Sequence, residues 1–335
     1  MINIRQEVSL LSRNTFGIAA TATVFVESDN HAELSDFVRS LPDPAEVFVL
    51  GGGSNVLFVS ERLNVVLHPV MKGIELIDET DEHVQVRVGT GEIWDDFVNW
   101  CVNRHYAGVE NLSYIPGTVG ACPIQNIGAY GAEAKETVEA VEAIEKETGH
   151  AVSFNNQQCH FDYRDSLFKK NKGKYIITAV RFRLSKRFEP NVKYSDLETE
   201  LSRNTSVTLK DVRQAIIDIR RRKLPDPSEL GNVGSFFKNP TIHIEKSNEI
   251  SKIFPKAPLY PVSEEYCKIS AAWLIQQCGW KGIREGNVGT HERQPLVIVN
   301  YGGVSGNDIL NFARKIIEAV YRRFGVGLEP EVNIV

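Results

Sequence analysis

The chain has 335 residues, which at about 100–200 residues per domain predicts two or three domains, and 42% of it is hydrophobic and 24% charged, as in ordinary folded proteins. A net charge of −5 argues against a nucleic-acid binder, which would carry a basic face, and no apolar run approaches the ~20 residues that span a bilayer. Because the N-terminus lacks a signal-peptide pattern and the five scattered cysteines form no C-x-x-C pair, we expect a cytoplasmic protein without a metal site or disulfide framework.

The first half opens with strands around a glycine turn. Residues 47–50 are predicted to form a buried strand, and the glycine turn Gly51–Asn55 leads into a second apolar run at 56–59. A dinucleotide-binding fingerprint needs a helix that opens at the glycines, whereas here β-rich segments continue at 65–67 and 84–88. The glycine turn therefore argues against a Rossmann unit.

A helix and a long loop come next. Apolar residues recur at helical spacing between 91 and 106, and Gly108 follows as a stop. Residues 113–131 form a long loop that is too apolar to be disordered, so we expect it to fold against the rest of the protein. Residues 138–154 fit a hairpin that turns at Thr148–Gly149, although their Ala and Glu content also permits a helix.

The middle of the chain contains a strand and a second helix. Residues 175–184 alternate as a strand with one apolar face, and the polar, weakly patterned stretch 185–207 is interpreted as a linker or excursion. A helix is predicted from Thr208, with Asp211 as a capping-box variant, and it ends in Arg220–Lys223. We place a domain boundary near this helix.

The last part alternates helices and strands. A helix is predicted at 270–278, a strand at 295–300, and a helix from the Ser305 cap to Phe324, where Gly325 ends it. The combined pattern is of the α+β class, without internal repeats or low-complexity segments.

Ser235 is the first candidate for chemistry. It stands in the segment Gly231–Pro240, between glycines that let a backbone approach a ligand and the pair Phe236–Phe237, which can exclude water. In isolation such a serine is more often a buried turn residue than a proton-handling group. A role for Ser235 in proton transfer is therefore supported only if other segments also indicate an active site.

Other candidates are also ambiguous when taken alone. Gly51–Asn55 and residues 115–131 could form anion-binding nests for a pyrophosphate, or be plain tight turns. Arg164 could hold a carboxylate in a bidentate fork or be a surface turn residue. Arg220–Lys223 could bind phosphate or simply complement the end of a helix, and Glu331 could point inward or be solvated.

The order and joint presence of these segments closely resemble the UDP-N-acetylenolpyruvoylglucosamine reductase (UDP-N-acetylmuramate dehydrogenase) family, flavoenzymes of bacterial peptidoglycan precursor synthesis. Tyr194, within residues 192–196, is similar to the mobile tyrosine loop of the longer subtype of that family. The segments that carry the resemblance are 49–57, 115–121, 125–131, 163–166, 223–225, 234–240 and 328–332.

The resemblance implies an FAD-binding domain of the vanillyl-alcohol-oxidase type in two α/β parts, followed by an α+β substrate-binding domain. The boundaries expected from it are 1–70 and 71–207 for the two FAD-binding parts, 208–325 for the substrate-binding domain, and 326–335 for a C-terminal segment that returns to the active site. It also implies FAD and NADPH as cofactors, a UDP-sugar enolpyruvyl ether as substrate, and a monomer with no nucleic-acid or membrane partner.

The resemblance also implies roles for individual residues. Reduced FAD would give hydride to the enolpyruvyl terminal carbon, while Arg164 clamps the substrate carboxylate, Glu331 stabilises the enol form and Ser235 donates the proton. The substrate contacts it implies are Tyr163, Tyr194, Lys223, Asn239, Tyr260 and Gln294. The cofactor contacts it implies are Gly51, Gly52, Gly53, Ser54, Asn55, Ile115, Pro116, Gly117, Thr118, Gly120, Ala121, Gln125, Asn126, Ile127, Gly128, Ala129, Tyr130 and Gly131.

Two alternatives to this function stay open at this point. One is an FAD oxidase of the same fold with another substrate, which would consume oxygen without needing NADPH. The other is a flavin- or sugar-nucleotide-binding module that has lost turnover, against which the intact Ser235 argues.

Overall fold

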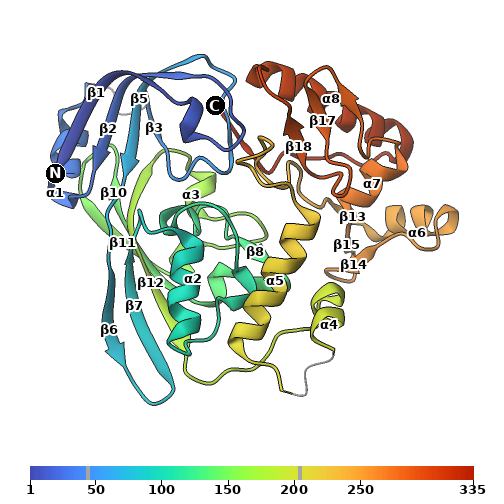
Figure 1. The fold of residues 1–335 in the computed structure, drawn as a ribbon, viewed down its shortest axis with the longest axis horizontal. Helices are drawn as coiled ribbons and strands as arrows, with labels where there is room; N and C mark the ends of the chain where they lie inside the picture. The colour runs from blue at the N-terminus through green and yellow to red at the C-terminus, as the bar shows by residue number, and fades with distance from the viewer. Residues whose placement is uncertain (43–45, 203–205) are drawn as a thin grey trace. The chain divides into compact units, whose positions relative to one another are not determined.

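The computed structural model describes residues 1–42, 46–202 and 206–335, and these divide into two compact units (Figure 1). Unit 1 comprises Met1–Val8, Thr21–Gly53 and Arg62–Arg222, and unit 2 comprises Ser9–Ala20, Ser54–Glu61 and Lys223–Val335. Within the described ranges, no helix combines the length and the apolar character needed to cross a membrane.

Unit 1 contains a four-stranded sheet with a helix packed on it. In spatial order its strands are β1 (Ile2–Ser9), β2 (Thr21–Ser28), β5 (Arg62–Pro69) and β3 (Val47–Val49), and the helix is α1 (His31–Ser40). β5 runs parallel to both β2 and β3. Leu34 and Val38 of α1 are buried in one cluster with Leu67 of β5. The strand predicted at 47–50 is confirmed as β3, although of its three residues only Val47 is fully buried.

A five-stranded antiparallel sheet forms the rest of the core of unit 1. Its strands, in order, are β11 (Ala151–Asn155), β10 (Val138–Glu145), β12 (Tyr175–Ser185), β7 (His83–Gly89) and β6 (Ile74–Glu79). Helix α2 (Trp94–Asn103) buries Trp94 and Phe97 in the same cluster as Phe182 of β12. The hairpin reading of 138–154 is confirmed, because β10 pairs with β11 across the turn at Gly149, whose φ is +67°.

The long loop after α2 is folded into this core, as predicted. Leu112, Val119 and Ile127 belong to the same buried cluster as the five-stranded sheet. The short elements in and after the loop are η3 (Glu110–Leu112), η4 (Val119–Ala121), β8 (Gly128–Ala129), β9 (Ala132–Glu133), η5 (Ala134–Glu136), η6 (Gln157–Cys159) and α3 (Leu167–Lys170).

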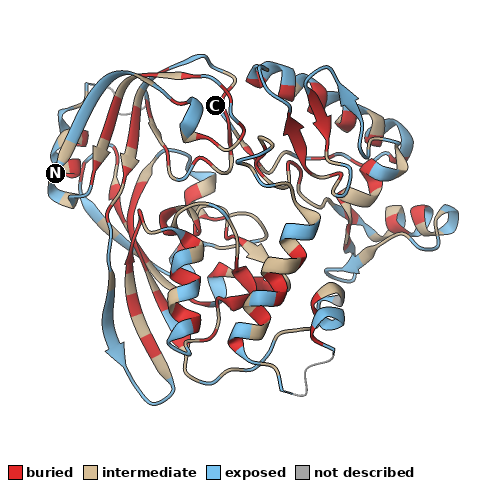
Figure 2. Cartoon of the chain, viewed as in Figure 1, coloured by how far each residue is buried: buried red, intermediate tan, exposed pale blue. Residues whose placement is uncertain are grey.

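The stretch 185–207, interpreted as a linker or excursion, contains a helix that was not predicted. Helix α4 (Ser195–Leu201) occupies it, because Leu197 and Leu201 are spaced four residues apart and are buried against Ile216 of helix α5 (Leu209–Lys223). Residues 203–205, also within that prediction, lie outside the described part of the chain. The predicted cap of α5 is confirmed, and its buried stripe is visible in Figure 2.

Unit 2 is a mixed α+β assembly. Its elements are η1 (Leu11–Arg13), β4 (Val56–Leu57), β13 (Thr241–His243), α6 (Ile244–Ile253), β14 (Leu259–Pro261), β15 (Tyr266–Ile269), α7 (Ala271–Gln277), β16 (Arg284–Glu285), β17 (Val288–Thr290), β18 (Ile298–Asn300), α8 (Gly306–Phe324) and β19 (Asn333–Ile334). α8 has the predicted Ser305 capping box and ends at Gly325, whose φ is +64°. The strand predicted at 295–300 is shorter than expected, because Val297 donates its N–H to the Gln294 carbonyl in a turn.

Candidate functional site

The two predicted glycine segments of unit 1 touch one another. A Cβ atom built on Gly52 would lie 2.9 Å from the Cα of Gly117, and one built on Gly51 would lie 3.1 Å from the Thr118 Oγ1. No side chain fits between backbones at that separation, so glycine is required at position 52 for the close approach. The turn at 51–53 and the loop at 115–131 therefore form one feature of unit 1.

Backbone strain is concentrated in the same region. Tyr114, Asn126, Tyr130 and Arg164 have φ angles of +59°, +44°, +49° and +53°, in the left-handed region that side chains other than glycine rarely adopt. Among the described residues that are not glycine, only Glu7, His105 and His160 share a positive φ. Such strain persists where the surroundings enforce it, and it is common at ligand-binding sites.

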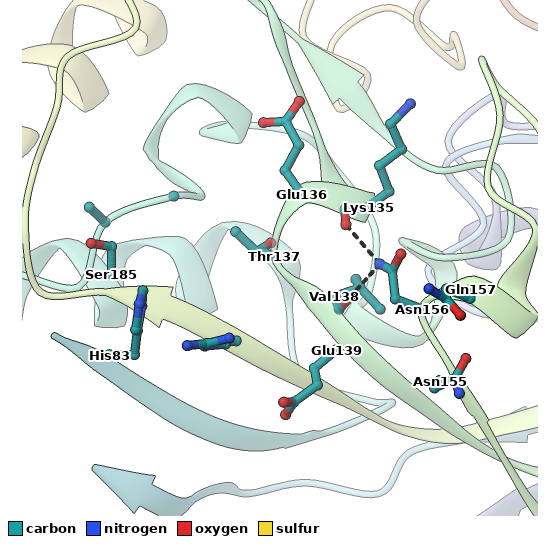
Figure 3. Close-up of a pocket in the computed structure, with 13 residues that line it drawn as sticks. His83, Lys135, Glu136, Thr137, Val138, Glu139, Asn155, Asn156, Gln157 and Ser185 are labelled. Carbon is teal, nitrogen blue, oxygen red and sulfur yellow. Dashed lines mark hydrogen bonds between the residues drawn. The ribbon is translucent and has the colours of Figure 1, made fainter. Parts of the chain in front are cut away.

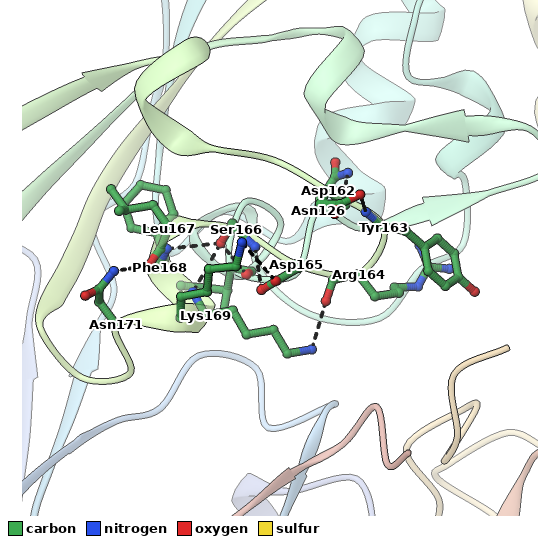
Figure 4. A network of polar contacts seen from close by, with 12 residues as sticks. Asn126, Asp162, Tyr163, Arg164, Asp165, Ser166, Leu167, Phe168, Lys169 and Asn171 are labelled. Atoms are coloured by element: carbon green, nitrogen blue, oxygen red, sulfur yellow. Dashed lines mark hydrogen bonds and ion pairs between the residues drawn. The ribbon is translucent and has the colours of Figure 1, made fainter. Parts of the chain in front are cut away.

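Asn126 holds the loop against the turn that carries Arg164. Its side-chain amide donates to the Asp162 carbonyl at 3.0 Å (Figure 4). The same amide donates to the Glu133 carboxylate at 2.9 Å. Its Oδ1 accepts the Lys135 N–H at 2.9 Å. Since Asn126 is fully buried and its amide bonds to the protein itself, it is a fixed brace between the two segments.

Arg164 lies beside the loop at 115–131, which is predicted to bind the cofactor and is called the cofactor loop below. Its Nη2 donates to the carbonyl oxygen of Gly128 at 2.5 Å. The Lys169 ammonium donates to the Arg164 carbonyl at 3.1 Å (Figure 4). Its guanidinium carbon is 5.4 Å from the centre of the Tyr163 ring, within cation–π range. The side chain is half-buried, and one edge of its planar fork is fixed by the loop.

Arg220 is a residue whose place the sequence reasoning missed. Its Nε donates to the Tyr114 carbonyl at 3.0 Å, and its side chain also hydrogen-bonds Tyr130 at the other end of the loop. Burial lowers the pKa of Arg220, against the opposing effect of the nearby Tyr130 and Asp95. The available clue was spacing, because Arg220 follows the buried Ile216 by four residues and continues that face of α5.

Asp95 secures the start of the loop. Its carboxylate accepts two hydrogen bonds from Arg213, at 2.6 and 2.8 Å, and one from the Tyr114 N–H at 2.5 Å. Burial works to raise the pKa of Asp95, but the hydrogen bonds from Arg213 and Tyr114 and the Arg213 charge outweigh it, so the pKa lies below its ordinary value. The Asp95 carboxylate is therefore ionised and holds Tyr114 in its strained conformation.

Tyr194 meets the far end of the loop. Its ring lies 5.4 Å from the Tyr130 ring, centre to centre, at an interplanar angle of 75°, which is a favourable edge-to-face arrangement. The Tyr194 side chain is nevertheless 50% exposed. The predicted substrate contact and the predicted cofactor contact are thus neighbours in unit 1.

Unit 2 brings Ser235 and Glu331 together. Glu331 donates its N–H to the carbonyl of Phe236 at 2.7 Å, and the Lys238 N–H donates to the Glu329 carbonyl at 3.0 Å. Phe236 is fully buried, while Ser235 is half-buried and its hydroxyl makes no hydrogen bond with any residue in the described ranges. Glu329 is exposed and Glu331 is half-buried, as expected if only one of the two carboxylates points inward.

Further predicted residues join this part of unit 2. Asn55 donates its side-chain amide to the Glu331 carbonyl at 3.4 Å. The Phe236 N–H donates to the carbonyl of Leu296, two residues after Gln294. Asn239 accepts the N–H of Ala271 at 2.9 Å at the start of α7. Asn55 and Glu331 are thus bonded directly, and Ser235 adjoins the residue that accepts the Glu331 N–H, whereas the bond of Asn239 goes to α7.

Two further predicted substrate contacts lie on other elements. Lys223 is half-buried and is the last residue of α5. Tyr260 lies on β14, opposite Lys268 of β15, and its side chain is 56% exposed. No hydrogen bond in the described ranges links the Tyr260 side chain to Ser235 or Glu331.

A depression of about 720 Å³ in unit 1 lies elsewhere (Figure 3). Its polar lining includes His83, Glu136, Asn156 and Arg183, from the ends of the five-stranded sheet and from η5. None of its lining residues belongs to the predicted cofactor, substrate or catalytic set. The candidate site is therefore defined by the loop contacts described above and not by this depression.

Two family models match the chain. A family model described as "FAD binding domain" matches residues 22–155, and one described as "UDP-N-acetylenolpyruvoylglucosamine reductase, C-terminal domain" matches residues 226–335. The UDP-N-acetylenolpyruvoylglucosamine reductase of Flavobacterium johnsoniae is 44% identical over all of both chains. That of Bacteroides fragilis is 43% identical over 99% of this chain and all of its own.

A solved structure shares the fold. It is the UDP-N-acetylenolpyruvylglucosamine reductase of Thermus caldophilus, which has a TM-score of 0.71 and 22% identity and covers 100% of this chain and 99% of its own. The expected fold, an FAD-binding domain combined with an α+β domain, is thereby confirmed. By full-length similarity to its curated relatives, the chain belongs to the UDP-N-acetylenolpyruvoylglucosamine reductase family.

Proposed function

We propose that this protein reduces UDP-N-acetylglucosamine enolpyruvate to UDP-N-acetylmuramate, with NADPH as reductant, in peptidoglycan precursor synthesis. Family membership supports an FAD-dependent oxidoreductase that acts on the enolpyruvyl sugar nucleotide. The single observation that carries the finer proposal is the hydrogen bond from the Glu331 N–H to the carbonyl of Phe236, the residue that follows Ser235.

The residues of unit 1 fit FAD. Contact between Gly52 and Gly117 leaves two glycine turns side by side, with no Cβ atom between their backbones. Such turns are suited to a pyrophosphate. We infer that the segments 51–55, 115–121 and 125–131 hold the cofactor, and that the strained Tyr114 and Tyr130 are the ends of the enclosing loop. When bound, FAD supplies hydride to the terminal carbon of the enolpyruvyl double bond.

Arg164 is proposed to bind the substrate carboxylate. A guanidinium presents two parallel donors that match a carboxylate, and charge builds on this group as the adjacent carbon becomes electron-rich. The hydrogen bond to Gly128 fixes one edge of the Arg164 fork before substrate arrives. The side chain therefore needs little reorganisation in order to stabilise that charge.

Ser235 and Glu331 are proposed to complete the reaction. The carbon next to the carboxylate needs one proton, and a serine hydroxyl can supply it because a carbanion is a much stronger base than an alkoxide. Glu331 stabilises the enol form of the substrate from the adjacent strand-like segment. Phe236 and Phe237, buried at 0% and 1% exposure, limit access of water to this hydroxyl from within unit 2.

The remaining predicted residues are proposed as contacts to the sugar nucleotide and its diphosphate. They are Tyr163, Tyr194, Lys223, Asn239, Tyr260 and Gln294. A cytoplasmic location belongs to the same proposal and is supported by five cysteines that are all free thiols. The proposal also treats the protein as a monomer, which light scattering on the purified sample tests.

The visible absorbance of the purified protein tests the proposed function. The sample should be yellow, lose its visible absorbance on anaerobic addition of NADPH, and regain it on addition of the enolpyruvyl sugar nucleotide. Recovery with oxygen but not with the sugar nucleotide would favour the oxidase alternative. A yellow sample that NADPH cannot bleach would favour a binding module.

A further inference from the structure

Asn111 joins two segments of unit 1 that are distant in the sequence. It lies in η3, just before the predicted cofactor loop, and it is 2% exposed. Its amide nitrogen donates to the carbonyl of Tyr130 at 2.8 Å and to the carbonyl of Asn191 at 2.8 Å. One side chain therefore connects the end of the cofactor loop with residues 191–194, which we call the tyrosine segment.

The tyrosine segment also donates a hydrogen bond to the cofactor loop. Asn191 donates its own side-chain amide to the Gly131 carbonyl at 3.1 Å. Three residues later, Tyr194 sets its ring against Tyr130. Val192 and Tyr130 also pack against the same buried cluster of α4 and α5. The two amides and two rings thus hold the tyrosine segment to the cofactor loop at both ends.

The Asn111 side chain is present for its two donor hydrogen bonds and not for packing in the core. Its Oδ1 is buried and has no hydrogen-bond partner among the described atoms. A buried acceptor without a partner is destabilising, so an apolar residue of similar size would suit the core better. The two donor bonds are what asparagine contributes here, and one of them fixes the carbonyl of Tyr130, a residue with φ of +49°.

We propose that Asn111 is a positioning residue, which anchors the tyrosine segment to the cofactor loop and thereby sets the orientation of Tyr194 toward the sugar nucleotide. The inference rests on the proposed function only where it names the ligand of Tyr194. Without the anchor, the tyrosine segment loses its attachment to the cofactor loop at Asn191, while the hydrogen bond between Arg164 and Gly128 is retained. Binding of substrate should suffer more than the chemical step.

The test compares Asn111→Ala with Asn156→Ala. Asn156 is a matched control, because its amide also donates to two backbone carbonyls of unit 1, those of Lys135 at 2.8 Å and Val138 at 2.6 Å (Figure 3). Its bonds do not involve the tyrosine segment. Trypsin is applied to both variants and to the wild-type holoenzyme, and mass spectrometry measures cleavage after the exposed Lys193.

We expect Asn111→Ala to speed cleavage after Lys193 and to raise KM for the sugar nucleotide, each by roughly tenfold, with kcat within about threefold of the wild type. Asn156→Ala should change neither quantity. Cleavage at the wild-type rate, or an equal rise in both variants, would overturn the anchor. Faster cleavage with an unchanged KM would overturn the role of the anchor in binding.

A second variant covers the case in which Asn111→Ala does not fold. Asn191→Ala removes only the bond to Gly131 from a half-buried position, so it should fold and show the same two effects more weakly. Unchanged cleavage after Lys193 in that variant would contradict the anchor. Because trypsin reports on the segment without any turnover, a wild-type protein inactive on the sugar nucleotide would refute the proposed function and leave the cleavage comparison valid.

Discussion

Glu331 donates its backbone N–H to the carbonyl oxygen of Phe236 at 2.7 Å, which fixes the residue proposed to stabilise the enol beside the proposed proton donor, Ser235. Almost a hundred residues separate the two in the chain, so no local pattern links them. Their pairing is antiparallel and continues from Phe237 to Pro330. This pairing brings two short segments of unit 2 side by side, although neither has a strong sequence pattern of its own.

The Arg164 fork should not be replaceable by another cation. Arg164→Lys keeps the positive charge but loses the planar pair of donors and the bond to the Gly128 carbonyl. We expect kcat with the sugar nucleotide to fall by about 10²–10³, in the range found when one charge-stabilising donor is removed. Arg183→Lys is the control, since this exposed arginine of unit 1 lies away from the loop. Steady-state kinetics close to wild type for Arg164→Lys would refute the clamp.

Gly52→Ala should separate the two glycine turns. Its Cβ would lie 2.9 Å from the Gly117 Cα, so backbone must move, at a cost of about 1–3 kcal/mol in the free energy of unfolding. We expect the purified variant to carry much less FAD per chain, measured by visible absorbance. Gly73→Ala separates this clash from backbone strain, because Gly73 has φ of +112° but open space around its Cβ position. Full FAD content in Gly52→Ala would contradict the proposed cradle.

The ion pair between Asp95 and Arg213 predicts how stability depends on pH. The pKa of Asp95 is lowered in the folded protein, so its contribution is fully present above the ordinary Asp pKa and is lost as the pH falls through the folded value. Asp95→Asn should therefore lower the free energy of unfolding by about 1–3 kcal/mol at neutral pH, and by less near pH ~3. Urea denaturation at both pH values measures this difference.

A control for the Asp95 prediction is Asp36→Asn. Asp36 pairs with Arg39, but its side chain is 72% exposed, so its loss should change stability by less than about 1 kcal/mol. The same penalty for Asp95→Asn at both pH values would mean that the charge of Asp95 is unimportant. A penalty equal to that of Asp36→Asn at neutral pH would mean that the pair does not hold the loop.

Elements with a strong local pattern could be predicted from the sequence. The capping residues Thr208 and Ser305 and the stop at Gly325 satisfy backbone groups next to them, so their effect is local and α5 and α8 were correctly placed. Helix α4 was missed because its stability comes from packing Leu197 and Leu201 against a helix that follows it. Two buried leucines among polar residues are too weak a pattern to distinguish a short helix from a linker.

The candidate site could be predicted only in part from the sequence, for the same reason. Gly52 could be recognised as a close-approach residue, but its partner Gly117 could not, because a sequence does not state which backbone comes near. Arg220 was assigned to the helix end, whereas its surroundings are set by Tyr114 and Tyr130. The assignment of roles came from resemblance to a family, and the roles of Arg164, Ser235 and Glu331 stay predictions.

The most direct test is a stopped-flow comparison of Ser235→Ala with the wild type, measured separately for the two half-reactions. Only the second half-reaction creates a carbanion, so flavin reduction by NADPH should stay within about twofold of the wild-type rate. Reoxidation by the enolpyruvyl sugar nucleotide should slow by at least ~10², in the range for loss of a general acid. Equal slowing of both half-reactions, or reoxidation at the wild-type rate, would contradict the assignment of Ser235 as the proton donor.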